Sequence, residues 1–486
     1  MPRARAPHFV LTMAAASLAL VVAGAPAQSV SDQSLSSQSV SGKSRPIQSV
    51  AVVDEPTTSP SASPSATSAP QPTTEPSATS TPTDCPLCAP DNYSPKNGAT
   101  FNHPFSAKDR GKIRRMLLRS INSVPGGGSI RAATFSINDW DTTRALMAAR
   151  KRGVSVQIIA DWHTAEPGVS PSFLALQKAF GTATSRPGMS ADRVSFVRTC
   201  THSCRYRSGN MHQKMYLFSQ VGDTKWVTMG GSANMTMMAV NGQWNHLTTY
   251  SNFDTYSDYL DIFNEMKLDR PQDVPGRIFN AGGINTWVFP RPNTSAGNDP
   301  MMDALDRVRC TGVKNAGLNG RTVIRIGMYS WYNDRGIWLA KNVRSLWDRG
   351  CNVAIEFALM SKPVRGILYN PAGRGRIPMK QVGVYATDGT VLKYLHHKYV
   401  AISGNYGGDP TSFVVFAGTT NFANLGLYSD EMTQRWNGYG VYSAYMADFR
   451  RIWVERNART PSPISSLGSD LDGRLGTGRY TNLSRD

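Results

Sequence analysis

Hydrophobic and polar residues follow the same order in two separate parts of the chain. Alternation with a period of two predicts a strand, apolar residues three to four positions apart predict a helix, and a short run rich in β-branched residues predicts a buried strand. The predicted elements are residues 130–137, 141–152 and 154–160 in the first part and residues 322–329, 336–349 and 352–357 in the second. Gly153 and Gly350 follow the two helices, where a left-handed cap favours glycine. The repeat predicts two similar halves.

Both halves are also predicted to close with a strand and a helix. These closing elements are residues 246–250 and 255–266 in the first half and residues 439–442 and 445–454 in the second. Strand–helix–strand units with buried strands predict the α/β class, with a mixed β-sheet flanked by helices in each half. The expected boundaries are residues 95–270 and 321–460 for the halves, 271–320 for a Gly-, Pro- and Asn-rich connection, and 461–486 for a C-terminal tail.

The motif His-x-Lys occurs once in each half, and each copy is followed by two strand-like runs and then by Gly-Ser/Thr-x-Asn. The copies are His212 and Lys214 with Ser232 and Asn234, and His396 and Lys398 with Thr419 and Asn421. One His-x-Lys triplet arises easily by chance. Two copies with the same downstream partner indicate one active site assembled from two halves.

These residue types suit the cleavage of a phosphodiester, which is anionic and resists attack by anionic nucleophiles. A neutral imidazole is a good nucleophile near pH 7, and a second, protonated imidazole can give a proton to the departing alkoxide. The lysines and asparagines, assisted by Ser232 and Thr419, would then hold the phosphoryl oxygens. This scheme requires neither a metal ion nor another cofactor.

The paired motifs resemble those of the phospholipase D superfamily, whose signature is H-x-K-x4-D with a downstream G-[ST]-x-N, present twice. The resemblance covers roughly residues 95–460. It implies that the two halves face each other across a pseudo-two-fold axis and share one central active site. In both copies the Asp of the signature is replaced, by Ser219 and by Ser403. Because that Asp is mainly a supporting residue in the family, we interpret the chain as a divergent member.

The resemblance also implies a role for Glu431, which follows Asn421 by ten positions. The family often carries a carboxylate there that orients a catalytic histidine, and the adjacent Asp430 is the alternative. The corresponding region of the first half has Asn245 and no acidic residue. A carboxylate that accepts a hydrogen bond from an imidazole fixes its tautomer and raises its basicity.

The neighbouring histidines of the second motif are predicted to have different roles. Residues two apart on a strand project from the same face. His212 therefore points with Lys214, and His396 points with Lys398, whereas His397 points to the opposite face. We accordingly predict a structural role for His397.

The composition bounds the location and the partners of the protein. Residues 1–27 have the basic start, apolar stretch and small-residue end of a secretory signal peptide, and residues 28–84 are rich in Ser, Thr, Pro and Gln, as in a disordered linker. The 486-residue chain has a net charge of +18, of which these two segments carry +2 and −3, so the remainder carries +19. Such a charge favours nucleic acid, anionic lipid surfaces or acidic cell-wall polymers as partners.

All six cysteines follow the predicted signal peptide, and an even number favours disulfide bonds. Their pairing is open from spacing alone, but Cys85–Cys88 and Cys200–Cys204 would close small loops and leave Cys310–Cys351. A zinc site around Cys200 and Cys204 lacks a clear fourth ligand.

The Arg-Tyr-Arg run at residues 205–207 either guides an anionic substrate or consists of solvated charges.

Together these observations predict a secreted, extracellular and monomeric phosphodiesterase that needs no metal ion. We expect His212 to attack phosphorus and His396 to act as acid and then as base, although the pseudo-symmetry permits the reverse. The expected substrate is a phospholipid at a membrane surface, cleaved by hydrolysis or by transfer of the headgroup. The alternatives are a nonspecific nuclease of the same superfamily and a catalytically inactive protein that binds polyanions of the cell envelope.

Overall fold

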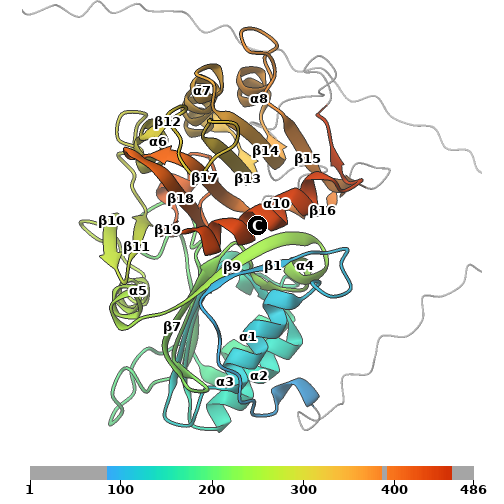
Figure 1. The fold of residues 1–486 in the computed structure, drawn as a ribbon. Coiled ribbons are helices and arrows are strands. Elements are labelled where there is room, and N and C mark those ends of the chain that lie inside the picture. The colour runs from blue at the N-terminus through green and yellow to red at the C-terminus, as the bar shows by residue number, and fades with distance from the viewer. Residues whose placement is uncertain (1–84, 386–390, 462–486) are drawn as a thin grey trace, which may run out of the picture. The chain divides into compact units, whose positions relative to one another are not determined.

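The computed structural model describes residues 85–385 and 391–461, all within one compact unit of the chain, residues 77–486 (Figure 1). The predicted signal peptide (1–27), the predicted linker (28–84) and the predicted C-terminal tail apart from Pro461 lie outside the described residues. Among the described residues, no helix combines the length and the apolar character needed to cross a bilayer.

The first half is built on a mixed sheet with the strand order β5-β4-β2-β6-β7-β9-β1. The strands are β1 (Gly98–Asn102), β2 (Ser129–Thr134), β4 (Ser155–Asp161), β5 (Phe196–Cys200), β6 (Lys214–Val221), β7 (Thr224–Gly231) and β9 (Gln243–Ser251). β2, β4 and β5 run parallel to one another, and the other neighbours are antiparallel. β4 is buried along its whole length because helices and loops cover both faces there, which explains its continuous apolar run.

Helices cover both faces of this sheet. α1 (Lys112–Asn122), α2 (Trp140–Lys151) and α3 (Pro171–Phe180) pack on one face, where Figure 1 shows them grouped, and α5 (Phe253–Met266) packs on the other. α2 begins where the Asp139 side chain accepts the N–H of Asp141, as an N-terminal cap does. The buried residues of α1 include Ile113, Leu117 and Ile121, which share one helix face.

The second half repeats this plan, which confirms the predicted α/β class and the internal repeat. Its sheet has the order β15-β14-β13-β17-β18-β19-β11-β10, and β13, β17, β18 and β19 correspond to β2, β6, β7 and β9. The strands are β10 (Arg277–Ala281), β11 (Ile284–Phe289), β13 (Val323–Trp331), β14 (Asn352–Met360), β15 (Met379–Tyr385), β17 (Lys398–Tyr406), β18 (Asp409–Gly418) and β19 (Glu431–Asn437). Helices α6 (Pro300–Asp306), α7 (Asn333–Asp348) and α8 (Lys362–Leu368) cover one face, and α10 (Tyr439–Trp453) covers the other.

One predicted element of the second half is wrong. Residues 439–442 were expected to form a strand, but they are the first turn of α10, and the strand before it is β19. Tyr442, Tyr445, Met446 and Phe449 are buried at spacings of three, one and three residues, which is the spacing of one helix face. Two turns are needed to see that period, so the first four residues resembled a short aromatic strand.

The three disulfide bonds join the cysteines that the spacing suggested. They are Cys85–Cys88, Cys200–Cys204 and Cys310–Cys351. The third bond ties the segment after β12 (Val308–Arg309) to the start of β14. No free cysteine occurs in the part of the chain that the structure describes.

Candidate active site

Lys214 begins β6, His212 lies two residues before it, and both contact the same aromatic ring. Lys214 is fully buried, and its Nζ donates a hydrogen bond to the carbonyl oxygen of His212 over 2.8 Å. The ring of Phe135, directly after β2, has its centroid 5.0 Å from that of the His212 ring and 5.1 Å from Lys214 Nζ. The Phe135 N–H donates to the Gln213 carbonyl oxygen over 3.0 Å. The backbone of β2 thus holds this ring against the motif.

The second motif has the same local arrangement, with Tyr329 in the place of Phe135. Lys398 Nζ donates to the carbonyl oxygen of His396 over 3.0 Å. The Tyr329 ring centroid lies 4.8 Å from the His396 ring and 4.8 Å from Lys398 Nζ. The Tyr329 N–H donates to the His397 carbonyl oxygen over 2.7 Å. The two halves therefore present the same His, Lys and aromatic group.

A backbone bridge places the first histidine beside the second half. Met211 and Asp430 form a parallel bridge, so the next residue on each segment is His212 on one side and Glu431 on the other. The His212 Nδ1 atom lies 2.7 Å from Glu431 Oε1, and both residues are buried. The carboxylate predicted to orient a histidine therefore contacts the histidine of the opposite half.

An equivalent bridge places the second histidine beside the first half. Leu395, the last residue of β16 (Val391–Leu395), pairs in parallel with Trp244 of β9. The following residues are His396 and Asn245, and His396 Nδ1 lies 2.8 Å from Asn245 Oδ1. The sequence drew attention to Asn245 only as the position without an acid. The structure makes it the partner of His396.

The Gly-Ser/Thr-x-Asn motifs hold the strands that carry Asn245 and Glu431. The Ser232 N–H donates to the His246 carbonyl oxygen, and the Thr419 N–H donates to the Met432 carbonyl oxygen, each over 2.9 Å. A Cβ at the preceding glycine would clash with that same oxygen in either half, so only glycine fits. His246 and Met432 are therefore equivalent positions, and so are the residues before them, Asn245 and Glu431. Each imidazole is held by the other half, and the two motifs form one site.

Burial and nearby cations set the charge of Glu431 in opposite directions. Burial raises the pKa of Glu431 to about 8, although Lys214, the Thr419 hydroxyl and Lys398 each lower it. Because the lysines of both motifs act on this one carboxyl group, the electrostatics also indicate a shared site. A carboxyl with such a pKa holds a proton at neutral pH and releases it in mildly alkaline solution.

The amide of Asn245 fixes the tautomer of His396. Asn245 Nδ2 donates to Gln243 Oε1 over 2.9 Å, so Oδ1 faces His396 and also accepts the Ser232 hydroxyl over 2.8 Å. His396 must then carry its proton on Nδ1. The Nε2 atom is buried and has no hydrogen-bond partner among residues 85–385 and 391–461. It therefore offers a lone pair to an incoming group.

His396 is neutral in the unliganded protein. Burial lowers its pKa well below the usual value, and the positive charges of Lys398 and Lys214 lower it further. An anion placed between the motifs would raise that pKa again, because opposite charge favours the protonated imidazole. Binding of an anionic substrate can thus protonate His396, and His396 must be protonated to act as the acid.

The two motif asparagines have side-chain atoms that nothing in the described residues satisfies. Asn234 Nδ2 and Oδ1 are buried without a hydrogen-bond partner there, and Asn421 Oδ1 is in the same condition. Buried amides of this kind are rare unless a ligand or water completes them. Asn234 is therefore well suited to bind a phosphoryl oxygen. Within the described ranges, no group of three or more His, Cys, Asp or Glu side chains is arranged to hold a metal ion.

The hydroxyls of Ser232 and Thr419 already have partners within the protein. Ser232 Oγ donates to Asn245, and Thr419 Oγ1 accepts the N–H of Met432 over 2.9 Å. Their predicted contact with substrate remains a prediction. The structure gives Ser232 a second task, because it supports the amide that orients His396.

His396 and His397 both lie in the link between β16 and β17, and their side chains contact different groups. The His397 Nε2 atom is 2.9 Å from Asp448 Oδ2 in α10, and its Nδ1 atom is 3.4 Å from His246 Nδ1. The imidazole is fully buried between the two halves. This geometry supports the structural role predicted from the two-residue strand period.

Ser219 and Ser403, which replace the signature Asp, lie far from the histidines. Ser219 is five residues beyond Lys214, roughly 16 Å along the strand. Its Oγ accepts the Ser129 N–H over 2.8 Å, and Ser403 Oγ accepts the Gly317 N–H over 2.8 Å. Ser219 therefore fastens the start of β2 and Ser403 fastens a neighbouring loop, each at the end of its sheet away from the active site.

Asp430, the alternative to Glu431, fastens the loop that leads into the first motif. Its Oδ2 atom accepts the Cys204 N–H over 2.6 Å.

Arg205 is fully buried and donates to Glu265 and to the carbonyl oxygens of Phe289 and Pro275, so it neither guides substrate nor faces solvent. Both predictions for Arg205, guidance of substrate and a solvated charge, are therefore wrong, because the arginine is buried and bonded within the protein.

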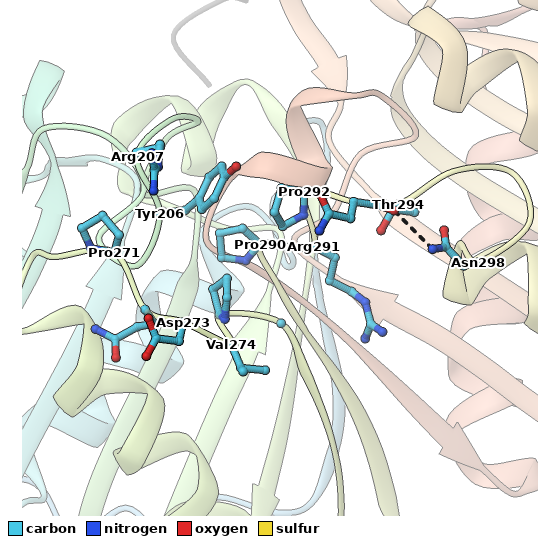
Figure 2. A pocket seen from close by; sticks show the side chains of 14 residues that line it. Tyr206, Arg207, Pro271, Asp273, Val274, Pro290, Arg291, Pro292, Thr294 and Asn298 are labelled. Carbon is cyan, nitrogen blue, oxygen red and sulfur yellow. Dashed lines mark hydrogen bonds between the residues drawn. The ribbon is translucent and has the colours of Figure 1, made fainter. Parts of the chain in front are cut away.

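The residues after Arg205 line an open pocket. Tyr206 and Arg207 form one wall, and Pro290 and Arg291 form another, around a cavity of about 540 Å³ (Figure 2). Tyr206 lies six residues before His212, and Pro290 directly follows Phe289, which pairs with Glu431. Two of the segments that line the pocket thus continue along the chain to His212 and to the strand partner of Glu431.

The sequence analysis missed four residues that support the site. Phe135 and Tyr329 form the aromatic walls, and they could have been found because each lies at the end of a predicted strand. Asp161 accepts the Met211 N–H over 2.9 Å and contacts His163 Nδ1 over 2.6 Å, while the His163 ring lies 4.3 Å from the Phe135 ring. No repeat in the second half marks this pair, so no comparable signal for it exists in the sequence.

Comparison with known proteins finds one matching family model. Residues 117–267 match the family model described as "Cardiolipin synthase, PLD-like domain". No curated protein matches the chain significantly. Three solved structures resemble it at low identity, and their likeness concerns the fold alone.

The phosphatidylserine synthase of Haemophilus influenzae is 10% identical over 80% of this chain and 92% of its own, with a TM-score of 0.49. The phospholipase D family member Nuc from Salmonella typhimurium is 21% identical over 36% and 94%, with a TM-score of 0.26. The polyphosphate kinase of Porphyromonas gingivalis is 9% identical over 73% of this chain, with a TM-score of 0.45, and the chain spans 49% of that enzyme's length. The family match includes the first His-x-Lys motif, and residues 117–267 therefore form a phospholipase D-like domain, as the resemblance to the phospholipase D superfamily predicted.

Proposed function

We propose that the protein cleaves phosphodiesters through a covalent phosphohistidine at His212. The observation that carries this proposal is the crossed contact of each histidine with the other half. His212 meets the carboxyl group of Glu431, which raises the basicity of the imidazole once it is ionised, whereas His396 meets an amide, which only orients it. The more basic ring is the better nucleophile, and His212 is therefore assigned that role.

In the first step the Nε2 atom of His212 attacks phosphorus. The bond from phosphorus to the leaving oxygen breaks, and His396 Nε2 gives its proton to the departing alkoxide. In the second step His396 accepts a proton from water, or from an alcohol in a transfer reaction, whose oxygen attacks phosphorus and breaks the bond to His212. Lys214, Lys398, Asn234 and Asn421 hold the phosphoryl oxygens throughout.

A phospholipid is the substrate that we propose, and a nucleic acid is the second candidate. The charge of +19 on the chain beyond residue 84 favours any polyanion and does not separate the two. Exposed apolar side chains beside the second motif favour the lipid, because nucleic acid offers no apolar layer to bury them. We further propose a secreted monomer, on the basis of the signal-like residues 1–27 and the three disulfide bonds.

The proposal is tested by offering the mature protein phospholipid vesicles and plasmid DNA in parallel, both with EDTA. Cleavage of the phospholipid that persists in EDTA is the expected result. Cleavage of DNA alone would establish the nuclease, and loss of all cleavage in EDTA would point to a metal ion. His212→Ala is the inactive reference. An inert wild type would support the polyanion-binding alternative.

A further inference from the structure

Large apolar side chains are exposed together where the first half meets β16 of the second half. Phe105, Met237, Met238 and Leu392 have exposed fractions of 47%, 42%, 38% and 48%. Phe105 lies in the loop between β1 and α1, the methionines begin α4 (Met237–Asn241), and Leu392 lies in β16. Figure 1 shows α4 beside β1. Single exposed apolar residues are ordinary, but a group of this size marks an interaction surface.

Lys393 links these segments into one surface. Its Nζ atom donates to the carbonyl oxygen of Asn241 at the end of α4, and it lies 5.3 Å from the centre of the Phe105 ring. Asn102 fixes the loop to α4, because its Nδ2 donates to the Ala239 and Val240 carbonyl oxygens and its Oδ1 accepts the Gly111 N–H. The apolar side chains therefore sit on a rigid base.

Cations surround these apolar residues. Arg115 donates to the carbonyl oxygens of Lys108 and Arg110, so these three cations lie together, and Lys393 lies beside Phe105. The carboxylate in their midst, Asp109, is engaged by Arg451 over 2.7 Å. Burial, and then the charge of Arg110, lower the pKa of Lys393, so these cations repel one another. We call the four apolar and four basic residues the apolar–basic rim.

The apolar–basic rim adjoins the His396 side of the site. Leu392 precedes His396 by four residues on an extended segment, roughly 13 Å. Met237 follows Asn234 by three residues, at most about 11 Å. The Phe105 ring lies 5.5 Å from the ring of Trp244, the residue before Asn245. A partner bound at the rim therefore lies close to the phosphate-binding asparagine and the proposed acid.

We propose that the apolar–basic rim docks the protein on an anionic lipid bilayer. The aliphatic and aromatic side chains enter the boundary between headgroups and acyl chains, and the surrounding cations contact the acidic headgroups. This inference rests on the proposed function, because it delivers headgroup phosphates to the histidines. A nucleic acid would satisfy the cations but would leave Met237, Met238 and Leu392 in water.

The test uses a rim variant and a matched control. Phe105→Ser with Leu392→Ser removes two apolar rim residues, and Leu268→Ser with Ile278→Ser removes residues that are 47% and 50% exposed around α5 and β10, away from α4 in Figure 1. Binding is measured by sedimentation with vesicles of phosphatidylcholine containing about one third phosphatidylglycerol. Both variants carry His212→Ala in this assay, so turnover does not alter the vesicles.

The rim variant should bind the vesicles at least tenfold more weakly than the parent, and the control should change by less than about twofold. Arg110→Gln with Lys393→Gln should weaken binding about fivefold per charge, and only for vesicles with the anionic lipid. In the background with His212 intact, the rim variant should cleave a soluble phosphodiester at the parent rate, which shows that it is folded.

Equal vesicle binding by the rim variant and the parent would overturn the docking surface. Loss of plasmid binding without loss of vesicle binding would overturn it in favour of nucleic acid. Rim-dependent binding to vesicles whose phospholipids are never cleaved would support the docking surface and refute the proposed phospholipase activity. The two proposals therefore fail in distinguishable ways.

Discussion

Glu431 and Asn245 occupy equivalent positions but give their histidines different chemistry. A carboxylate can take the Nδ1 proton of His212 or hold it by charge, whereas an amide oxygen only accepts that of His396. The pseudo-symmetry visible in the sequence left the nucleophile undecided. The asymmetry of these two partners, which cross between the halves, favours His212.

Glu431→Gln should lower the maximum rate by roughly 10²–10⁴-fold and change its pH dependence. Below its pKa of about 8, protonated Glu431 donates to Nδ1 and leaves a proton on the Nε2 atom that must attack. In the wild type, kcat/KM should therefore rise as the pH passes 8. The variant should lack this rise. If kcat/KM of the variant still rises near pH 8, another group titrates at that pH.

The same carboxyl predicts how stability depends on pH. The pKa of Glu431 is about 8 in the folded protein, and an unfolded chain releases that proton near pH 4.3. Between about pH 4.5 and 8 the folded form binds the additional proton, so stability falls as the pH rises. Urea denaturation at both ends of this range should show a smaller decrease for Glu431→Gln than for the wild type. An equal decrease in stability for the variant and the wild type would contradict the raised pKa of Glu431.

His396→Ala should abolish turnover, whereas His397→Ala should leave much of it. His397 faces Asp448 and His246, so its loss leaves a buried carboxylate without its partner and should cost about 3–5 kcal/mol of stability. Steady-state kinetics on variants shown to be folded, together with denaturation curves, separate the two effects. A folded His397→Ala protein as inactive as His396→Ala would place both rings in the reaction.

At the scale of elements, β6 and β17 each have a lysine of the active site at one end and a serine with a structural role farther along the strand. Restoring the signature Asp by Ser219→Asp and Ser403→Asp should therefore change the rate by less than about threefold, since these positions lie roughly 16 Å from the lysines along their strands. Phosphodiesterase assays on the double variant check this. An inert wild type with an active double variant would make the natural protein a binder on a former enzyme scaffold.

The elements that were predicted correctly are long enough for their hydrophobic period to repeat. The strand pairs, α2, α5 and α7 extend over two or more turns or alternations, whereas the first turn of α10 was mistaken for a strand. Arg205 was also misjudged, since its burial depends on Glu265 and two carbonyl oxygens that are remote in sequence. Local pattern carries no information on such contacts.

At the scale of the molecule, the duplicated motif predicted one site from two halves, and the crossed contacts are what unite them. The sequence could place His212 with Lys214, because two residues on one strand share a face. It could not place His212 with Glu431, because that contact depends on the bridge between Met211 and Asp430. Such pairings between distant segments are decided by packing and have no local signal.

The covalent intermediate tests the central claim most directly. The wild type, His212→Ala and His396→Ala are treated with an activated phosphodiester, quenched in alkali because phosphohistidine is labile to acid, and analysed by mass spectrometry. We predict an adduct on His212 in the His396→Ala protein, where a good leaving group needs no acid, and none in the His212→Ala protein. An adduct on His396 in the His212→Ala protein would reverse the roles, and no adduct in any of the three would contradict the covalent mechanism.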